Sequence, residues 1–114
     1  SNRISILREK INNLIAEVEI LIDEYPDNEE IETYMDLLED VQDDLDEVSK
    51  KLDVIRSKLE EARLEVSSEL REEIFEKISD MIGDLEQEID DMDEQVDNIE
   101  EDIEIIKSNL QDQV

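Results

Sequence analysis

Carboxylates are the most concentrated chemical groups in this chain, and they are densest between residues 90 and 104. That stretch, DDMDEQVDNIEEDIE, holds nine carboxylates among fifteen residues and no lysine or arginine. Such groups could ligate a metal, work as an acid–base pair, offer a polyanionic surface to a basic partner, or simply coat a helix in water. The choice depends on the elements that position them.

Catalysis is the first chemistry that the composition limits. The chain has no histidine and no cysteine, so Ser-His-Asp and Cys-His arrangements are excluded. A pair of carboxylates acting as acid and base needs one member with a raised pKa, and burial is the usual cause. Every predicted core position is apolar or aromatic, so no carboxylate is expected to be buried. We therefore expect no enzyme activity and no catalytic residues.

Metal and cofactor sites are equally poorly supported by the sequence. A di-metal site in a helical bundle uses inward-facing glutamates together with a Glu-x-x-His motif, and histidine is missing here. A calcium loop of the EF-hand type needs a central glycine, which the stretch DDMDEQ lacks. No glycine-rich phosphate loop is present either. We expect no dedicated metal ion and no cofactor, only weak and nonspecific binding of calcium or magnesium.

The apolar residues follow alternating steps of three and four, which predicts amphipathic helices. The first run consists of Ile4, Leu7, Ile11, Leu14, Val18, Leu21 and Tyr25. Pro26 ends this run, and Asp27 or Asn28 can cap the next helix, whose first turn is rich in glutamate.

Two longer runs complete the pattern, and runs of this length are typical of coiled coils. The second run consists of Ile31, Tyr34, Leu38, Val41, Leu45, Val48, Leu52, Ile55, Leu59, Ala62 and Val66. The third consists of Leu70, Ile74, Ile78, Met81, Leu85, Ile89, Met92, Val96, Ile99, Ile103, Ile106 and Leu110. Two pairs of consecutive steps of four in the third run are stutters, which locally unwind a left-handed supercoil.

Two joins leave alternatives open. Between the second and third runs, EVSSEL contains no glycine or proline. We favour a hairpin turn there, capped by Ser67 or Ser68, over one continuous helix that would be about 125 Å long. Gly83 either forms a second hinge or lies inside one helix, at a cost of about 1 kcal/mol; the second option is slightly preferred.

These patterns predict an all-α fold, an antiparallel three-helix bundle or coiled coil of long helices with a two-helix hairpin tip. We expect a single domain over residues 1–114, with helices at about 3–25, 28–66 and 69–112. The tip comprises residues 51–83, where only two helices are available to bury apolar side chains. Whether the first helix packs within its own chain or is swapped between copies stays open.

The acidic residues occupy the outer positions of the heptads and are unevenly distributed along the chain. Of the net charge of −27, residues 11–49 carry −15 and residues 78–114 carry −13, while residues 50–77 carry only −1. Folded side by side over roughly 40 Å, the two acidic segments would carry about one charge per 1.4 Å of axis, whereas duplex DNA carries about one per 1.7 Å. This density is compatible with imitation of a nucleic acid.

Two functions follow from the pattern, and both are non-catalytic. The preferred one is a protein–protein interaction or assembly module, homodimeric through an oligomer interface at Val54, Leu64, Phe75 and Ile82. The alternative is an inhibitor that mimics DNA or RNA and occupies the basic groove of a nucleic-acid-binding protein. Its partner-binding acidic face would consist of Asp43, Asp44, Asp46, Glu47, Asp90, Asp91, Glu94, Asp97, Glu101 and Glu104.

The charge and hydropathy also indicate which partners to expect. Direct binding of nucleic acid or an anionic membrane would be opposed by repulsion, no run approaches the roughly 20 apolar residues of a membrane span, and we expect a cytoplasmic protein. If the acid only solvates the bundle, changing Asp90, Asp97 and Glu104 to lysine should raise stability and leave binding intact. If the acid binds the partner, the same change should abolish binding.

Overall fold

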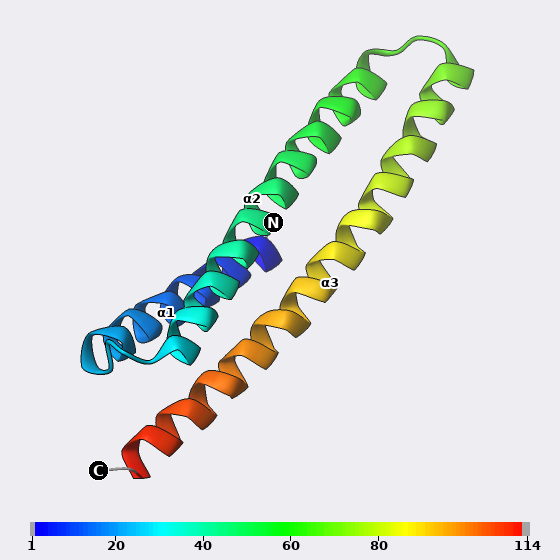
Figure 1. Ribbon diagram of the computed structural model, residues 1–114. Coiled ribbons are helices and arrows are strands. Elements are labelled where there is room, and N and C mark those ends of the chain that lie inside the picture. The colour runs from blue at the N-terminus through cyan, green and yellow to red at the C-terminus, as the bar shows by residue number, and fades with distance from the viewer. Residues whose placement is uncertain (1, 113–114) are drawn as a thin grey trace.

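The computed structural model describes residues 2–112, which form three α-helices: α1 (Asn2–Glu24), α2 (Glu29–Leu64) and α3 (Ser68–Asp112). α2 and α3 make a long antiparallel hairpin, and α1 folds back along the half of α2 that is farther from the hairpin turn (Figure 1). The molecule measures 70 × 20 × 18 Å. The predicted all-α three-helix bundle is confirmed, and α1 packs within its own chain.

The turn between α1 and α2 is built as its sequence predicts. α1 ends at Glu24, just before Pro26, which cannot donate the backbone hydrogen bond that would continue the helix. Asn28 is the N-cap of α2, and its side chain accepts a hydrogen bond from the backbone N–H of Ile31 at 3.2 Å. Asn28 thus satisfies one of the backbone donors left unpaired at a helix start.

The second join is a hairpin turn at residues 65–67 and not a continuous helix. The Ser67 hydroxyl accepts from the backbone N–H of Leu70 at 3.4 Å, which starts α3. The guanidinium of Arg71 donates to the backbone carbonyl of Glu65 at 2.7 Å and so satisfies an acceptor at the end of α2. Gly83 lies inside α3, which runs through it without a break.

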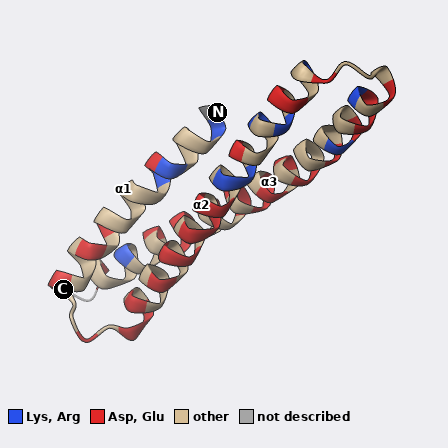
Figure 2. Cartoon of the chain, turned by 90° about the horizontal axis from the view of Figure 1, so that it is seen from above, with Lys and Arg blue, Asp and Glu red and all other residues tan. Residues whose placement is uncertain are grey.

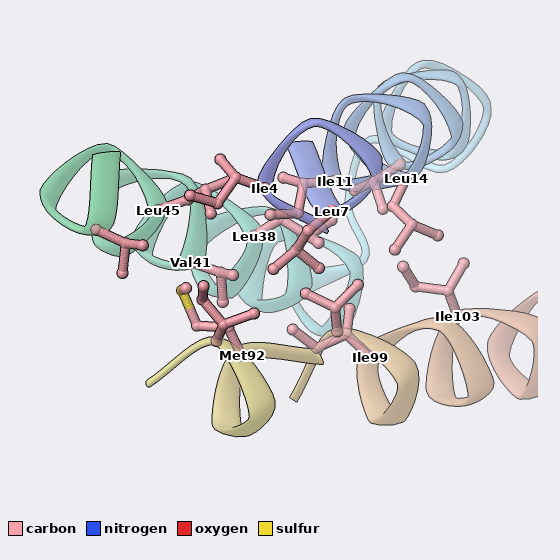
Figure 3. Close-up of a cluster of buried hydrophobic side chains, with 14 of the residues drawn as sticks. Ile4, Leu7, Ile11, Leu14, Leu38, Val41, Leu45, Met92, Ile99 and Ile103 are labelled. Carbon is pink, nitrogen blue, oxygen red and sulfur yellow. The ribbon is translucent and has the colours of Figure 1, made fainter. Parts of the chain in front are cut away.

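The core lies where the three helices meet. It contains Ile11, Val18, Leu38, Val41, Leu45 and Val96, all with 0% exposure, and Figure 3 shows side chains from all three helices pointing into it. No polar or charged side chain is buried among the residues whose burial is described. No helix within residues 2–112 has a stretch long and apolar enough to cross a membrane.

Three positions that the spacing assigns to the seam are exposed. Leu59 is 45% exposed, Leu70 is 49% exposed and Val66 is 91% exposed. α2 ends at Leu64, so Val66 lies in the turn. Leu59 and Leu70 lie in the tip, where no third helix covers the hairpin (Figure 1). The expectation that these three residues are buried in the seam is therefore wrong, because Val66 lies beyond the end of α2 and because two helices alone leave one side of the seam open.

Candidate functional site

Basic residues of α1 bind acidic residues of α3 at matching heptad positions. Arg3 donates to Asp90 at 2.6 Å and to Asp93 at 3.1 Å. One heptad later Lys10 donates to Asp97, and its ammonium lies 3.9 Å from Glu100. These pairs join residues of constant separation, because α1 and α3 run parallel and share the heptad spacing. They fix the register of α1 on the hairpin.

Two further contacts hold α1 on the hairpin. Arg8 donates to Asp46 of α2 at 2.8 Å and to the Ser49 hydroxyl at 3.2 Å. Near the far end of α3, Lys107 donates to Glu17 at 2.8 Å and lies 3.7 Å from Glu104. The cations of α1 thus bind carboxylates on both helices of the hairpin.

These ion pairs change the protonation equilibria of their basic partners. The hydrogen bond from Lys10 to Asp97 raises the pKa of the lysine above its ordinary value, although partial burial opposes this. The pKa of Lys107 is raised in the same way by its hydrogen bond to Glu17. Both ammonium groups therefore stay charged to higher pH than a free lysine does.

The ten carboxylates of the predicted acidic face do not form one surface. Asp46, Asp90, Asp97 and Glu104 lie on the side of the hairpin that α1 occupies, where each is in an ion pair with a lysine or arginine. Asp44, Glu47 and Asp91 are brought together elsewhere, around a groove between α2 and α3. Asp43, Glu94 and Glu101 are exposed and do not line this groove.

The acidic groove is an open depression of about 420 Å³. Its lining consists of Asp44, Glu47, Val48, Lys51, Glu88, Asp91, Met92 and Gln95. Val48 and Met92 are buried and form its floor, and the ion pair between Lys51 and Glu88, 2.6 Å long, closes the end nearer the tip. The pKa of Lys51 is raised by its hydrogen bond to Glu88. The carboxylates of the groove can attract a cationic group.

Cations gather at two places in the molecule. Figure 2 shows lysine and arginine at the start of α1 and along the tip parts of α2 and α3, whereas acidic residues dominate the rest of the hairpin. Among residues 2–112 no group of three or more carboxylates is arranged to hold a metal ion.

The predicted oligomer interface is exposed at all four positions. Val54 is 47% exposed, Leu64 71%, Phe75 48% and Ile82 41%. Of the large apolar residues exposed within residues 2–112, seven lie in the tip (residues 51–83) and three lie outside it. An exposed apolar group of this kind, concentrated in one region, is typical of a binding surface, whereas isolated exposed apolar residues are ordinary.

Two features of the site were not predicted from the apolar spacing. One is the set of ion pairs that α1 makes with α3; the signal for it was the seven-residue spacing shared by Arg3 and Lys10 and by Asp90 and Asp97. The other is the exposure of Leu59, which the spacing assigns to the seam and which instead adds to the exposed apolar surface of the tip.

Comparisons with models of protein families, with curated proteins and with solved structures found no match. The surfaces of the chain itself are therefore what indicate a function.

Proposed function

We propose that this chain is a non-catalytic assembly module that binds another protein through the apolar surface of its two-helix tip. The observation that carries this proposal is a change in burial along the same two helices. The apolar heptad residues are buried or half-buried where α1 is present. In the tip, residues directly between α2 and α3, such as Ile78, stay buried, whereas Leu59, Leu70, Phe75 and Ile82 are 41–49% exposed because no third helix lies over them. Apolar surface left open in this way gains free energy when a partner covers it.

The charge distribution supports the same location. Residues 50–77 carry seven basic and eight acidic groups, whereas the segments on either side carry −15 and −13. The negative electrostatic potential is weakest at the tip and strong over the rest of the hairpin, so a protein partner that is not basic would be repelled least at the tip. The tip thus combines exposed apolar side chains with the charge balance that ordinary protein interfaces tolerate.

A second candidate function is imitation of a nucleic acid, and one observation favours it. Asp44, Glu47 and Asp91 face the same groove from two helices. A basic partner could bind there, and its affinity would fall steeply with salt because the attraction is electrostatic. The pairing of Asp46, Asp90 and Asp97 with cations of α1 leaves less acid free for such a partner, so this function ranks second.

A capture experiment with three immobilised proteins tests the two functions. The unmodified chain is compared with a tip variant, Phe75→Gln with Ile82→Gln, and with a groove variant, Asp44→Asn, Glu47→Gln and Asp91→Asn. Each is exposed to a protein extract of the source organism at about 0.15 M and about 1 M salt, where the screening length falls from about 8 Å to about 3 Å. Bound proteins are identified by mass spectrometry.

The two functions predict opposite results. If the tip is the binding surface, the tip variant loses the captured protein, the groove variant keeps it, and high salt does not release it. If the groove variant loses a basic partner that high salt also releases, while the tip variant retains it, the assembly function is wrong and the second candidate replaces it.

A further inference from the structure

We propose that the partner of the tip is a second copy of this chain. It binds antiparallel to the tip, on the same side of the hairpin on which α1 packs in the three-helix part. This inference rests on the proposed function and specifies it. The tip face is defined here as Leu52, Leu59, Phe75 and Ile82. Leu52 is half-buried and the other three are exposed.

The tip face continues the surface on which α1 lies. On α2, steps of seven residues connect Leu45 to Leu52 and Leu59; on α3, they connect Val96 to Ile89, Ile82 and Phe75. Residues seven apart lie on nearly the same side of a helix.

Ion pairs show which side of the hairpin this is. The residues that follow Leu45, Ile89 and Val96 are Asp46, Asp90 and Asp97, and each of these pairs with a cation of α1. Figure 3 shows Leu45 near Ile4 in the same cluster. Both lines of residues therefore lie toward α1 in the three-helix part, and their continuations, Leu59 and Phe75 among them, form a face that no described residue covers.

Two of the four residues predicted for the oligomer interface lie elsewhere. Val54 is one residue before the buried Ile55, so it is turned by about 100° from the seam of α2. Leu64 is two residues after the buried Ala62 and is turned by about 200°. These residues do not share the tip face with Phe75 and Ile82, and they provide a matched control.

Charge favours a second copy bound through the tip and disfavours one bound anywhere else. Each copy carries −27 in total, but residues 50–77 carry only −1. Two copies paired through their tips in opposite directions keep their acidic segments at opposite ends of the assembly, which limits the repulsion between them. The same surface is used on both copies, as a two-fold symmetric dimer requires.

The antiparallel arrangement also brings opposite charges together. The uncovered part of the hairpin, from Leu52 to Leu64, is about 18 Å long at about 1.5 Å per residue. Overlap of this length places the first turns of α3 in one copy, with Glu69 and Glu72, near the basic residues Arg3 and Arg8 of the other. Both glutamates are exposed. Arg3 and Arg8 already bind carboxylates of their own chain, so any contact with these glutamates is shared and adds less than the apolar tip face does.

The size of the tip face sets the strength of the dimer. A surface about 18 Å long and two helices wide, about 20 Å, covers about 400 Å² per copy. Stable interfaces bury about 800 Å² per partner. We therefore expect a dimer that dissociates on dilution in the micromolar range and not an obligate one.

Sedimentation equilibrium of the full chain over a range of concentrations tests the proposal. The unmodified chain should show a monomer–dimer equilibrium that persists at about 1 M salt, where electrostatic contacts are screened. Phe75→Gln with Ile82→Gln should raise the dissociation constant by about 100-fold or more. The control, Val54→Gln with Leu64→Gln, should leave it unchanged, and circular dichroism checks that both variants are helical.

Disulfide trapping gives a second measurement that does not depend on the glutamine variants. The sequence has no cysteine, so a single substitution provides the only thiol. Leu59→Cys, near the middle of the tip face, should form disulfide-linked dimers at least about 10-fold faster than Leu64→Cys, because a two-fold axis near residue 59 holds the two thiols together.

A chain that stays monomeric at all concentrations, or that links equally fast through both cysteines, overturns the second-copy proposal. These failures can be told apart from failure of the proposed function. A monomeric chain that still captures another protein through Phe75 and Ile82 keeps the assembly function and replaces the second copy by that protein. Capture that does not depend on these residues overturns the assembly function itself.

Discussion

At the scale of single residues, Tyr34 is the point where the core and the acidic surface meet. Its ring is half-buried and packs against the buried cluster, and its hydroxyl donates to Asp102 across the α2–α3 seam at 3.0 Å. Burial raises the pKa of Tyr34 above 10.0, and the hydrogen bond to Asp102 adds to the shift. Both effects favour the neutral phenol over the phenolate.

This shift makes the stability of the fold depend on alkaline pH in a defined direction. The folded state keeps the Tyr34 proton to higher pH than the unfolded state does, so the stabilisation is complete below pH 10.0 and falls as pH rises through the folded pKa. In a Tyr25→Phe variant Tyr34 is the only tyrosine, and its phenolate absorbance should titrate with a midpoint above 10.0. Asp102→Asn should lower that midpoint, and a midpoint that Asp102→Asn leaves unchanged contradicts this account.

Residue burial could be predicted from the sequence wherever three helices meet. Ile11, Val41 and Val96 were assigned to the seam by their spacing, and all three are fully buried. The same spacing does not predict the exposure of Leu59 and Leu70. Heptad spacing indicates which side of a helix faces its neighbour, but it does not indicate whether a third helix also packs against that side. The exposed apolar residues of the tip are those for which the local pattern and the tertiary environment disagree.

At the scale of elements, α1 decides which part of the hairpin is covered. Which side of the hairpin α1 occupies could not be predicted from its apolar spacing, since both sides of an antiparallel helix pair offer a groove. The structure indicates a reason for the choice: on the occupied side Arg3, Lys10 and Arg8 reach Asp90, Asp97 and Asp46. On the other side the acidic groove already has Lys51 bound to Glu88.

These pairs change what is expected of lysine substitutions in the acidic segments. Replacement of Asp97 by lysine removes the partner of Lys10 and puts a like charge beside it, whereas Glu101 has no such contact with α1. A general gain in stability from reversing Asp90, Asp97 and Glu104 is therefore no longer expected, because Asp90 and Asp97 hold α1 in place. Glu101→Lys should still stabilise α3 by a few tenths of a kcal/mol, because it relieves like-charge neighbours at i−4 and i+3.

A double-mutant cycle measures the coupling of α1 to α3. Lys10→Glu should destabilise the fold, and Asp97→Lys added to it should restore stability, with a coupling energy of about 0.2–1 kcal/mol in urea unfolding. The value should lie toward the lower end because the Lys10 and Asp97 side chains are 34% and 63% exposed. Glu101→Lys combined with Lys10→Glu is the control and should show almost no coupling. Equal coupling in the two cycles would mean that the register of α1 on α3 is different.

At the scale of the whole molecule, the chain joins a three-helix body to a two-helix tip. The body buries most of the apolar residues and carries most of the negative charge, whereas the tip, residues 51–83, carries only −3 and is open on one side. Net charge of −27 disfavours the compact state through self-repulsion, so added salt should stabilise the body. Its effect on the tip depends instead on how much apolar surface the tip can cover.

Hydrogen exchange measured residue by residue separates the two parts. Amides in the tip helices, for example those of residues 55–62 and 74–81, should exchange faster than those of residues 38–48 and 92–103, because local opening exposes less apolar surface where only two helices pack. If two copies cover each other's tip face, raising the protein concentration should slow exchange in the tip and leave the body unchanged, since binding stabilises only the segment that it covers.

Phe75→Gln with Ile82→Gln should remove this concentration dependence, whereas Val54→Gln with Leu64→Gln should preserve it. Uniform exchange along α2 and α3 at low concentration would instead mean that the hairpin unfolds as one unit, and the tip would then be held as firmly as the body without any partner.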